Sequence, residues 1–433
     1  MKVLLFILSI ISFSYALPFS LVKHETSKNE GPTLLVIGGI HGNEPGSYFA
    51  ASILSQYYTI NKGNLWVVPN LNPMSIAMNS RGIHGDMNRK FADINISDPD
   101  IKTIQEIQKI ITDPKVDLIL NLHDGHGFYR KEYKNSIFNP AAWGQTCVID
   151  QESLDSNHPY KDLDKIALAV RQEVNDGLIE DHHCFAIRNT NTRLDDEAMK
   201  HSLTFFAINH NKPAFAIETS KNLPMLHEKV FYQLRAIEGY MRYMGISYTR
   251  SFDLSSENLK NILKYDGNVT INNTTALNFE NLRNELSFIP LQSEGNDFKF
   301  SHPLGFVVKT NDKYDLYIGN RKTSSLTPSF HEAGIHEGNV TIVVDNNRRN
   351  ITFATEFLVT ADFKIINNNQ DTRVNIIGYL PKKGTEEANM QVGLNDLDPK
   401  YSLDRDHKVY RVEFYKGNRF CGMILAHFKQ DTR

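Results

Sequence analysis

The chain has 433 residues, of which 41% are apolar and 22% are charged, an ordinary composition for a globular protein of two or three domains. The formal net charge of −3 provides no basic field that would attract nucleic acid. Beyond the N-terminus no segment has the length and apolarity of a membrane span, so we expect no stable membrane insertion.

The first 16 residues have the pattern of an export signal. Lys2 supplies the positive charge, residues 3–13 form an apolar core, and Ser14 and Ala16 place small side chains where a signal peptidase cleaves. A membrane anchor or a buried strand is the alternative, but the apolar core is too short to span a bilayer. We expect residues 1–16 to be a signal peptide and the mature chain to work outside the cytoplasm.

Strand and helix patterns alternate through residues 17–246, which predicts an α/β domain with a parallel or mixed sheet covered by helices. Ligands of such sheets gather at the carboxyl ends of the strands. Short apolar runs bounded by Gly, Pro or Asn predict strands near residues 33–39, 64–70, 116–122, 184–188 and 213–219. Helical spacing predicts helices near residues 44–58, 98–112, 162–176 and 224–246.

The pattern changes after residue 246, where short β-rich runs punctuated by turns replace the helical periodicity. We expect two small β-rich domains here, at residues 247–337 and 338–433. The second has the strand spacing of a sandwich, for which the immunoglobulin type is a candidate.

A candidate metal site begins where the first apolar run ends in IGGIHGNEPG. His41 and Glu44 lie on the turn that leaves this strand, and glycines around them allow a close approach of the backbone. His123 ends another apolar run, although the nearby His126 is a competitor. Two histidines and one glutamate are a ligand set of catalytic zinc hydrolases, so zinc-assisted hydrolysis is the leading interpretation.

Two further segments carry polar residues with a chemical use. The loop at residues 69–89 contains Arg81, Asp86, Asn88 and Arg89, and guanidinium groups bind carboxylates through a two-pronged fork. Taken alone, this loop would be interpreted as a charged surface loop without a binding role. Glu218 ends a buried apolar run, where a carboxylate is costly unless it is used or paired; beside a metal site it can act as a general base.

Four motifs follow one another along residues 30–246: HGNE, an NP loop followed by Arg81 and DMNR, LHDG, and the strand-borne ET. Together they make this segment resemble the zinc carboxypeptidases of the carboxypeptidase A type. The resemblance implies one zinc ion per chain, held by His41, Glu44 and His123. It implies further roles for Glu218 as catalytic base, Arg81 as the residue that polarises the scissile carbonyl, Asn88 and Arg89 as binders of the substrate's terminal carboxylate, and Asp86 as the acceptor for the second ring nitrogen of His41.

The order of signal peptide, catalytic domain and two β modules resembles the periplasmic D,L-carboxypeptidases that trim peptidoglycan stem peptides and set helical cell shape in Gram-negative bacteria. This resemblance implies hydrolysis of the γ-D-glutamyl–meso-diaminopimelate bond of a muramyl tripeptide. It also implies a pocket for the second amino-acid head of diaminopimelate, for which Trp143 and Thr204 are candidates. The β modules could bind other cell-shape proteins.

Two rival functions stay open. A zinc deacylase of small N-acyl amino acids shares the HGNEP style of motif, but an export signal and trailing β modules argue against it. A wall-binding scaffold without catalysis is the other rival, and the intact set of ligands, base and arginines argues against that.

Cysteine and asparagine residues raise two minor questions. Cys147 and Cys184 are the only cysteines within one expected domain and could form a disulfide outside the cytoplasm, although buried free thiols are the simpler alternative. Asn95, Asn268 and Asn339 match the extended bacterial N-glycosylation acceptor, a pattern that also arises by chance.

Overall fold

The computed structural model describes residues 18–26, 30–195, 197–335, 339–367, 371–380 and 387–429. The chain divides into two compact units, Met1–Lys264 and Tyr265–Arg433. The expected signal segment at residues 1–16 lies outside the described residues. None of the helices in the described ranges is long and apolar enough to cross a bilayer.

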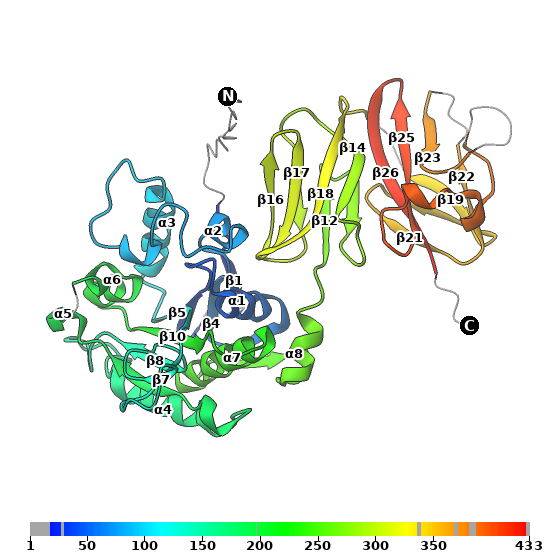
Figure 1. Ribbon diagram of the computed structural model, residues 1–433. Coiled ribbons are helices and arrows are strands. Elements are labelled where there is room, and N and C mark those ends of the chain that lie inside the picture. Colours follow the sequence, from blue (N-terminus) through cyan, green and yellow to red (C-terminus); the bar gives the residue numbers. More distant parts are fainter. Residues whose placement is uncertain are drawn as a thin grey trace, which may run out of the picture. The chain divides into compact units, whose positions relative to one another are not determined.

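A seven-stranded mixed sheet with the order β1-β4-β2-β5-β10-β8-β9 forms the centre of the first unit (Figure 1). The four central strands β4, β2, β5 and β10 run parallel, whereas β1 and β8 are antiparallel to their neighbours β4 and β10. This confirms the expected α/β architecture. The strands of the first unit are β1 (Val22–Glu25), β2 (Thr33–Ile37), β3 (Tyr58–Lys62), β4 (Asn64–Val68), β5 (Leu118–Gly125), β6 (Phe128–Tyr129), β7 (Phe138–Asn139), β8 (Thr146–Ile149), β9 (Ala186–Asn189), β10 (Ala214–Ser220) and β11 (Ser247–Arg250).

Helices cover both faces of this sheet. Helices α1, α4 and α7 pack together on one face, and Figure 1 shows α3 and α6 on the other side. Helix α3 buries Ile104, Ile107 and Ile111, whose spacing of three and four residues forms one apolar stripe. The helices are α1 (Pro45–Tyr57), α2 (Pro73–Ala77), α3 (Ile101–Ile111), α4 (Leu163–Asn175), α5 (Thr192–Asp195), α6 (Leu203–Asn209), α7 (Leu226–Tyr243) and α8 (Ser256–Ile262), with 3₁₀ turns η1 (Met87–Arg89), η2 (Asp181–His183) and η3 (Met199–His201).

The central strands bring the carboxyl ends of β2, β5 and β10 to one edge of the sheet, because all three run parallel. Their side chains are buried on both faces, as the continuous apolar runs in the sequence predict. In β5 and β10, His123 pairs with Glu218 across the two strands. This register places two of the predicted site residues side by side.

The first unit extends beyond the boundary at residue 246 that the sequence suggests. Strand β11 pairs with β3, and helix α8 packs on α7. The buried carboxylate of Glu238 on α7 accepts a hydrogen bond from the Tyr58 hydroxyl at 2.7 Å and lies 2.7 Å from Nε of Arg250. These polar contacts tie β11 to the first unit. The sequence gives no sign of this, because helical periodicity is lost after residue 246.

Within its described residues, the second unit holds β-sheets and two 3₁₀ turns but no α-helix, in agreement with the expected β-rich domains. Two four-stranded sheets, β20-β19-β22-β24 and β21-β26-β25-β23, share one apolar core and form a sandwich in the C-terminal part. The preceding part holds the sheets β13-β12-β15 and β14-β18-β17-β16. The elements are β12 (Asn268–Ile271), β13 (Thr275–Asn278), β14 (Glu285–Leu291), β15 (Phe298–Phe300), β16 (Gly305–Thr310), β17 (Lys313–Ile318), β18 (Arg321–Phe330), β19 (Val340–Val344), β20 (Asn347–Ile351), β21 (Glu356–Val359), β22 (Asp362–Ile366), β23 (Arg373–Ile376), β24 (Val392–Gly393), η4 (Leu394–Asp396), η5 (Pro399–Tyr401), β25 (Val409–Lys416) and β26 (Arg419–Phe428).

The cysteines are free thiols, so the disulfide considered between Cys147 and Cys184 does not form. Burial raises the pKa of the Cys147 thiol to about 12, which makes it an unreactive part of the core. The three candidate glycosylation residues, Asn95, Asn268 and Asn339, are all exposed, and their modification stays a prediction.

Candidate metal site and substrate pocket

The turn between β2 and α1 carries His41 and Glu44 into the edge of the sheet. Gly42 must be a glycine, because a Cβ atom there would lie 1.8 Å from the Ser75 carbonyl oxygen of α2. Pro45 then begins helix α1 directly after Glu44. The tight turn leaves His41 and Glu44 only 1% and 2% exposed, so neither is the solvated loop residue that the isolated motif could have been.

Three side chains converge at this edge, as the sequence predicts for a metal site. Glu44 lies between the two rings: its Oε1 is 3.1 Å from Nδ1 of His41, and its Oε2 is 2.9 Å from Nδ1 of His123. All three residues are buried, and their ligand atoms could hold one ion together. The competitor His126 is exposed and does not belong to this group.

The surroundings of His41 fit a bound cation. Its Nε2 lies 2.8 Å from Oδ1 of Asp86, whereas its buried Nδ1 has no hydrogen-bond partner and faces Glu44. If Nε2–H donates to Asp86, the lone pair of Nδ1 points at a carboxylate oxygen, an unfavourable contact that a metal ion would resolve. Burial alone would lower the pKa of His41, but Glu44 and Asp86 raise it above its ordinary value, so the same negative charge attracts a cation here.

Asp86 stays ionised beside this ring. Burial alone would raise its pKa, but His41 and Arg81 hold it well below the ordinary value. Nε of Arg81 lies 2.9 Å from Oδ2 of Asp86, while Nη1 of Arg81 lies 3.2 Å from Oε1 of Glu44. Arg81 is therefore anchored at the metal site and remains about half exposed toward solvent.

Glu218 lies on β10 level with His123, and its carboxyl group faces the same pocket. Among the described residues, its side chain forms no hydrogen bond or ion pair. Burial raises the pKa of Glu218 well above its ordinary value, and the negative charges of Glu44 and Asp124 raise it further. A carboxyl group in this condition readily accepts and releases a proton.

The turn η1 presents Asn88 and Arg89 to the pocket. The backbone N–H of Asn88 donates to Oδ1 of Asp86 at 2.9 Å, which begins the turn. The side-chain Oδ1 of Asn88 accepts from the Leu203 N–H at 2.9 Å, so its amide NH₂ remains to donate to a ligand. Nη1 of Arg89 donates to the Asn88 carbonyl at 2.9 Å, which holds the guanidinium beside that amide.

All the predicted site residues except Asp86 line one pocket of about 280 Å³, including Trp143 and Thr204. The guanidinium of Arg188 lies over the Trp143 ring at 3.9 Å from its centroid, and Oγ1 of Thr204 lies 3.2 Å from Oγ of Ser202. Both side chains are thus held in place at the wall of the pocket.

The sequence interpretation missed three polar residues of this pocket, Asn121, Asp124 and Lys221. Asn121 is fully buried, and both polar atoms of its side chain lack a hydrogen-bond partner. It precedes His123 by two positions on β5 and therefore projects from the same face, a signal that strand periodicity offers. Nζ of Lys221 lies 3.5 Å from Oε1 of Glu44. The only sequence signal for this contact is that Lys221 follows Glu218 by three residues.

Comparison with known protein families matches both ends of the chain. Residues 1–264 match the family described as "Carboxypeptidase controlling helical cell shape catalytic". Residues 335–429 match the family described as "C-terminal domain of metallo-carboxypeptidase". A search of curated proteins found no match.

Solved structures of the cell shape determinant protein Csd4 from Helicobacter pylori are similar to nearly the whole chain. The apo form is 32% identical with a TM-score of 0.90, and the match covers 95% of this chain and 100% of that one. The tripeptide-bound form is 32% identical with a TM-score of 0.89 and the same two coverages. The form bound to mDAP, described as a D,L-carboxypeptidase, is 33% identical with a TM-score of 0.89, covering 94% of this chain and 100% of that one.

Proposed function

The chain belongs to the family of metallo-carboxypeptidases that control helical cell shape, and from this premise we propose that it is a periplasmic, zinc-dependent enzyme of peptidoglycan. In this proposal it removes meso-diaminopimelate from an uncrosslinked muramyl tripeptide and leaves a dipeptide. The tripeptide-bound and mDAP-bound forms of the similar Helicobacter pylori protein support this choice of substrate. The apolar segment at residues 1–16 supports export.

One observation carries the proposal: a buried group of two imidazoles and a carboxylate lies beside a carboxyl group that has no partner of its own among the described residues. His41, Glu44 and His123 would hold the zinc ion, because an unpartnered Nδ1 and a carboxylate meet there. A zinc ion at this position supplies Lewis acidity toward a carbonyl oxygen and a water molecule.

Glu218 and Arg81 act on the reacting groups in this proposal. Glu218 takes the proton of the attacking water and passes it to the amine that leaves, which its raised pKa favours. Arg81 donates to the oxygen on which negative charge develops, since its contacts with Asp86 and Glu44 hold it at the site while half of its surface stays open. Asp86 fixes the orientation of the His41 ring through its Nε2.

Four residues would bind the substrate. The fork of Arg89 and the free amide of Asn88 suit the terminal carboxylate, because both offer N–H donors toward the pocket. Trp143 and Thr204 would border the second amino-acid head of diaminopimelate: the hydroxyl can bind a polar group, and the indole covers the aliphatic part. Together these contacts would place the scissile bond beside Glu218.

The proposal is tested by digesting purified peptidoglycan fragments with the protein and identifying the products by mass spectrometry. We expect muramyl tripeptide to become dipeptide with release of free diaminopimelate, and we expect a chelator to stop the reaction and added zinc to restore it. Parallel incubation with an N-acetyl amino acid distinguishes this reaction from the deacylase alternative, which predicts hydrolysis of that substrate. Tripeptide that stays intact in the presence of zinc would reject the proposed substrate, and turnover that a chelator does not change would reject the proposed zinc.

A further inference from the structure

A groove runs over the second unit through three neighbouring hollows with volumes of about 730, 1020 and 910 Å³. Arg373 lines all three hollows and joins them into one groove, which we call the basic groove. Lysine and arginine outnumber glutamate along its walls, although the whole chain is slightly acidic. A local excess of positive charge on such a chain favours an anionic ligand.

Each hollow of the basic groove also presents an aromatic ring to solvent. Phe288, Phe330 and Tyr401 are 73%, 50% and 42% exposed, and they lie in different hollows or at their junction. The Arg373 guanidinium lies 4.9 Å from the centroid of the Tyr415 ring, a buried side chain that lines the same groove. Exposed rings and guanidinium groups in one groove form a surface on which flat apolar faces and anions can bind together.

Phe288 is held in an unfavourable conformation that its own packing does not explain. Its φ is +58°, a region that bulky residues rarely adopt, and a register shift in β14 between Ser287 and Ile289 turns it outward. Nη1 of the buried Arg411 donates to the Phe288 carbonyl at 2.9 Å, and Arg411 forms an ion pair with buried Glu413 at 3.1 Å. A buried ion pair thus holds the backbone that carries this exposed ring, and strain of this kind is typical of ligand contacts.

Arg283 contributes positive charge that the protein does not neutralise. Its guanidinium donates to the backbone carbonyls of Pro399 and Lys400 at 2.7 Å and of Asp404 at 3.1 Å, and its Nη2 also lies 2.8 Å from Nδ1 of His407; it forms no ion pair within the described residues. Carbonyl oxygens fix the orientation of the side chain but leave its full charge at the wall of the groove. An incoming carboxylate would meet an arginine that is already in place.

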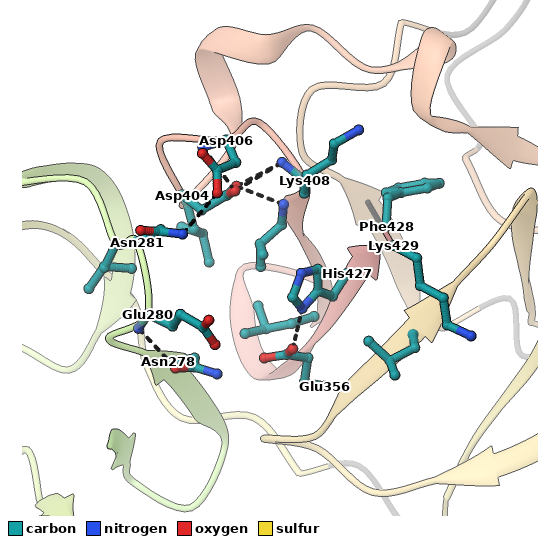
Figure 2. Close-up of a pocket in the computed structure, with 15 residues that line it drawn as sticks. Asn278, Glu280, Asn281, Glu356, Asp404, Asp406, Lys408, His427, Phe428 and Lys429 are labelled. Atoms are coloured by element: carbon teal, nitrogen blue, oxygen red, sulfur yellow. Dashed lines mark hydrogen bonds and ion pairs between the residues drawn. The ribbon is translucent and has the colours of Figure 1, made fainter. Parts of the chain in front are cut away.

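A second hollow in the same unit is lined by four carboxylates instead (Figure 2). Asp404 accepts hydrogen bonds from backbone N–H groups, Asp406 accepts from the Asn281 amide at 2.8 Å, and Glu356 lies 2.6 Å from Nδ1 of His427. Most of its charged groups are satisfied within the protein. It therefore serves as a matched control site for the basic groove.

We propose that the basic groove binds an acidic glycan, a polymer of pyranose rings with short peptide branches that bear carboxylates. The C–H faces of the rings would stack on Phe288, Phe330 and Tyr401, and the carboxylates would bind Arg283 and Arg373. Three consecutive hollows suit a chain rather than a single sugar. Peptidoglycan has this chemistry, and the choice of that polymer rests on the proposed function. All of these residues lie outside the unit that holds the candidate active site, so binding and catalysis can be measured separately.

The test is co-sedimentation of the full-length protein with insoluble peptidoglycan. We expect Arg373→Glu and Phe288→Asn each to weaken binding about tenfold or more, since each removes a charge-assisted or stacking contact. Phe288→Tyr keeps the ring and should keep binding, and Glu280→Gln in the acidic hollow should bind like the wild type. Phe288→Asn should fold normally, because asparagine tolerates a positive φ and no buried packing is lost.

Two outcomes would overturn the proposal. Wild-type binding by Phe288→Asn and Arg373→Glu would show that the groove does not contact the polymer. Competition by polyglutamate as strong as that by soluble glycan fragments would show attraction by charge alone. Turnover of soluble muramyl tripeptide should stay unchanged in all four variants, and its absence in the wild type would reject the proposed reaction while leaving the binding result to stand.

Discussion

Two hollows of this molecule each hold a buried carboxylate, and the two groups have opposite surroundings. In the pocket of the first unit, Glu218 has no partner among the described residues, and burial raises its pKa well above the ordinary value. In the acidic hollow of the second unit, Asp404 is 4% exposed, and its carboxylate accepts from the backbone N–H groups of Val409 at 2.8 Å, Lys408 at 2.9 Å and Asp406 at 3.1 Å.

The difference shows how a functional carboxylate can be told from a structural one. A buried carboxylate costs free energy unless hydrogen bonds or cations compensate for lost water. The loop at residues 404–409 provides that compensation for Asp404 and gains a fixed shape in return. The strand that carries Glu218 provides none, so the group stays available for a proton and a substrate. Changing each residue should therefore affect a different property of the protein.

Replacing Glu218 should have the largest effect, and on turnover alone. We expect Glu218→Gln to lower the rate of tripeptide hydrolysis by about 10²-fold or more, the usual contribution of a general acid–base group. Metal content should stay at one ion per chain, because His41, Glu44 and His123 are unchanged. The stability of the variant should equal or exceed that of the wild type, since a neutral amide costs less to bury. Near-normal turnover would contradict the assigned role.

Replacing Asp404 should affect stability instead. We expect Asp404→Ala to lower the free energy of unfolding of the second unit by roughly 3 kcal/mol, because buried N–H groups of Lys408 and Val409 lose their acceptor. Denaturant titration of the full chain measures this, and Asp404→Asn, which keeps one acceptor oxygen, should lose less. Hydrolysis of soluble tripeptide should not change. A fall in turnover without a fall in stability would break the comparison.

Much of the fold could be predicted from the sequence, because the central strands are continuous apolar runs. Strands β2, β4, β5, β9 and β10 and helices α1, α3, α4 and α7 lie where periodicity placed them, with ends that differ by a few residues. Strand β8 escaped notice because its four residues, TCVI, follow a Pro- and Gly-containing loop without any repeat. The pairing of β11 with β3 depends on tertiary contacts of Glu238, which no local pattern encodes.

The candidate site was predictable where motifs follow or end the central strands, as for His41, Glu44 and His123. Its finer features follow from three-dimensional packing. Asn121 and Lys221 join the pocket through the register of β5 and β10, and the orientation of the Asn88 amide is fixed by the distant Leu203 N–H. The basic groove has no motif at all, since its arginines come from separate strands and turns.

Replacing Arg89 tests substrate binding in the pocket of the first unit, apart from the proton transfer assigned to Glu218. We expect Arg89→Ala to lower kcat/KM for substrates with a free terminal carboxylate by about tenfold, chiefly through KM, because one charge-assisted contact is lost. Substrates with an amidated terminus should be hydrolysed equally by variant and wild type. Steady-state kinetics on the two substrates measure the ratio, and an equal loss on both would remove Arg89 from carboxylate binding.

The smallest expected effect lies in the acidic hollow and depends on pH. The hydrogen bond with Glu356 raises the pKa of His427 above its ordinary value, and the charges of Asp404 and Glu280 add to this. A raised pKa means that the folded state holds the proton more tightly. The stabilisation is therefore fully present below about pH 6.5, the pKa of histidine in an unfolded chain. It is lost as the pH rises through the higher pKa that His427 has in the folded state.

We expect this pair to contribute about 1 kcal/mol or less, since His427 is partly exposed. The measurement is the difference in unfolding free energy between the wild type and His427→Gln across this pH range. Taking the difference cancels the contribution of the other titrating groups, which both proteins share. The difference should shrink as the pH rises. A constant difference would mean that His427 contributes by packing alone, and the acidic hollow would then owe its stability to the backbone contacts of Asp404 rather than to internal charge pairing.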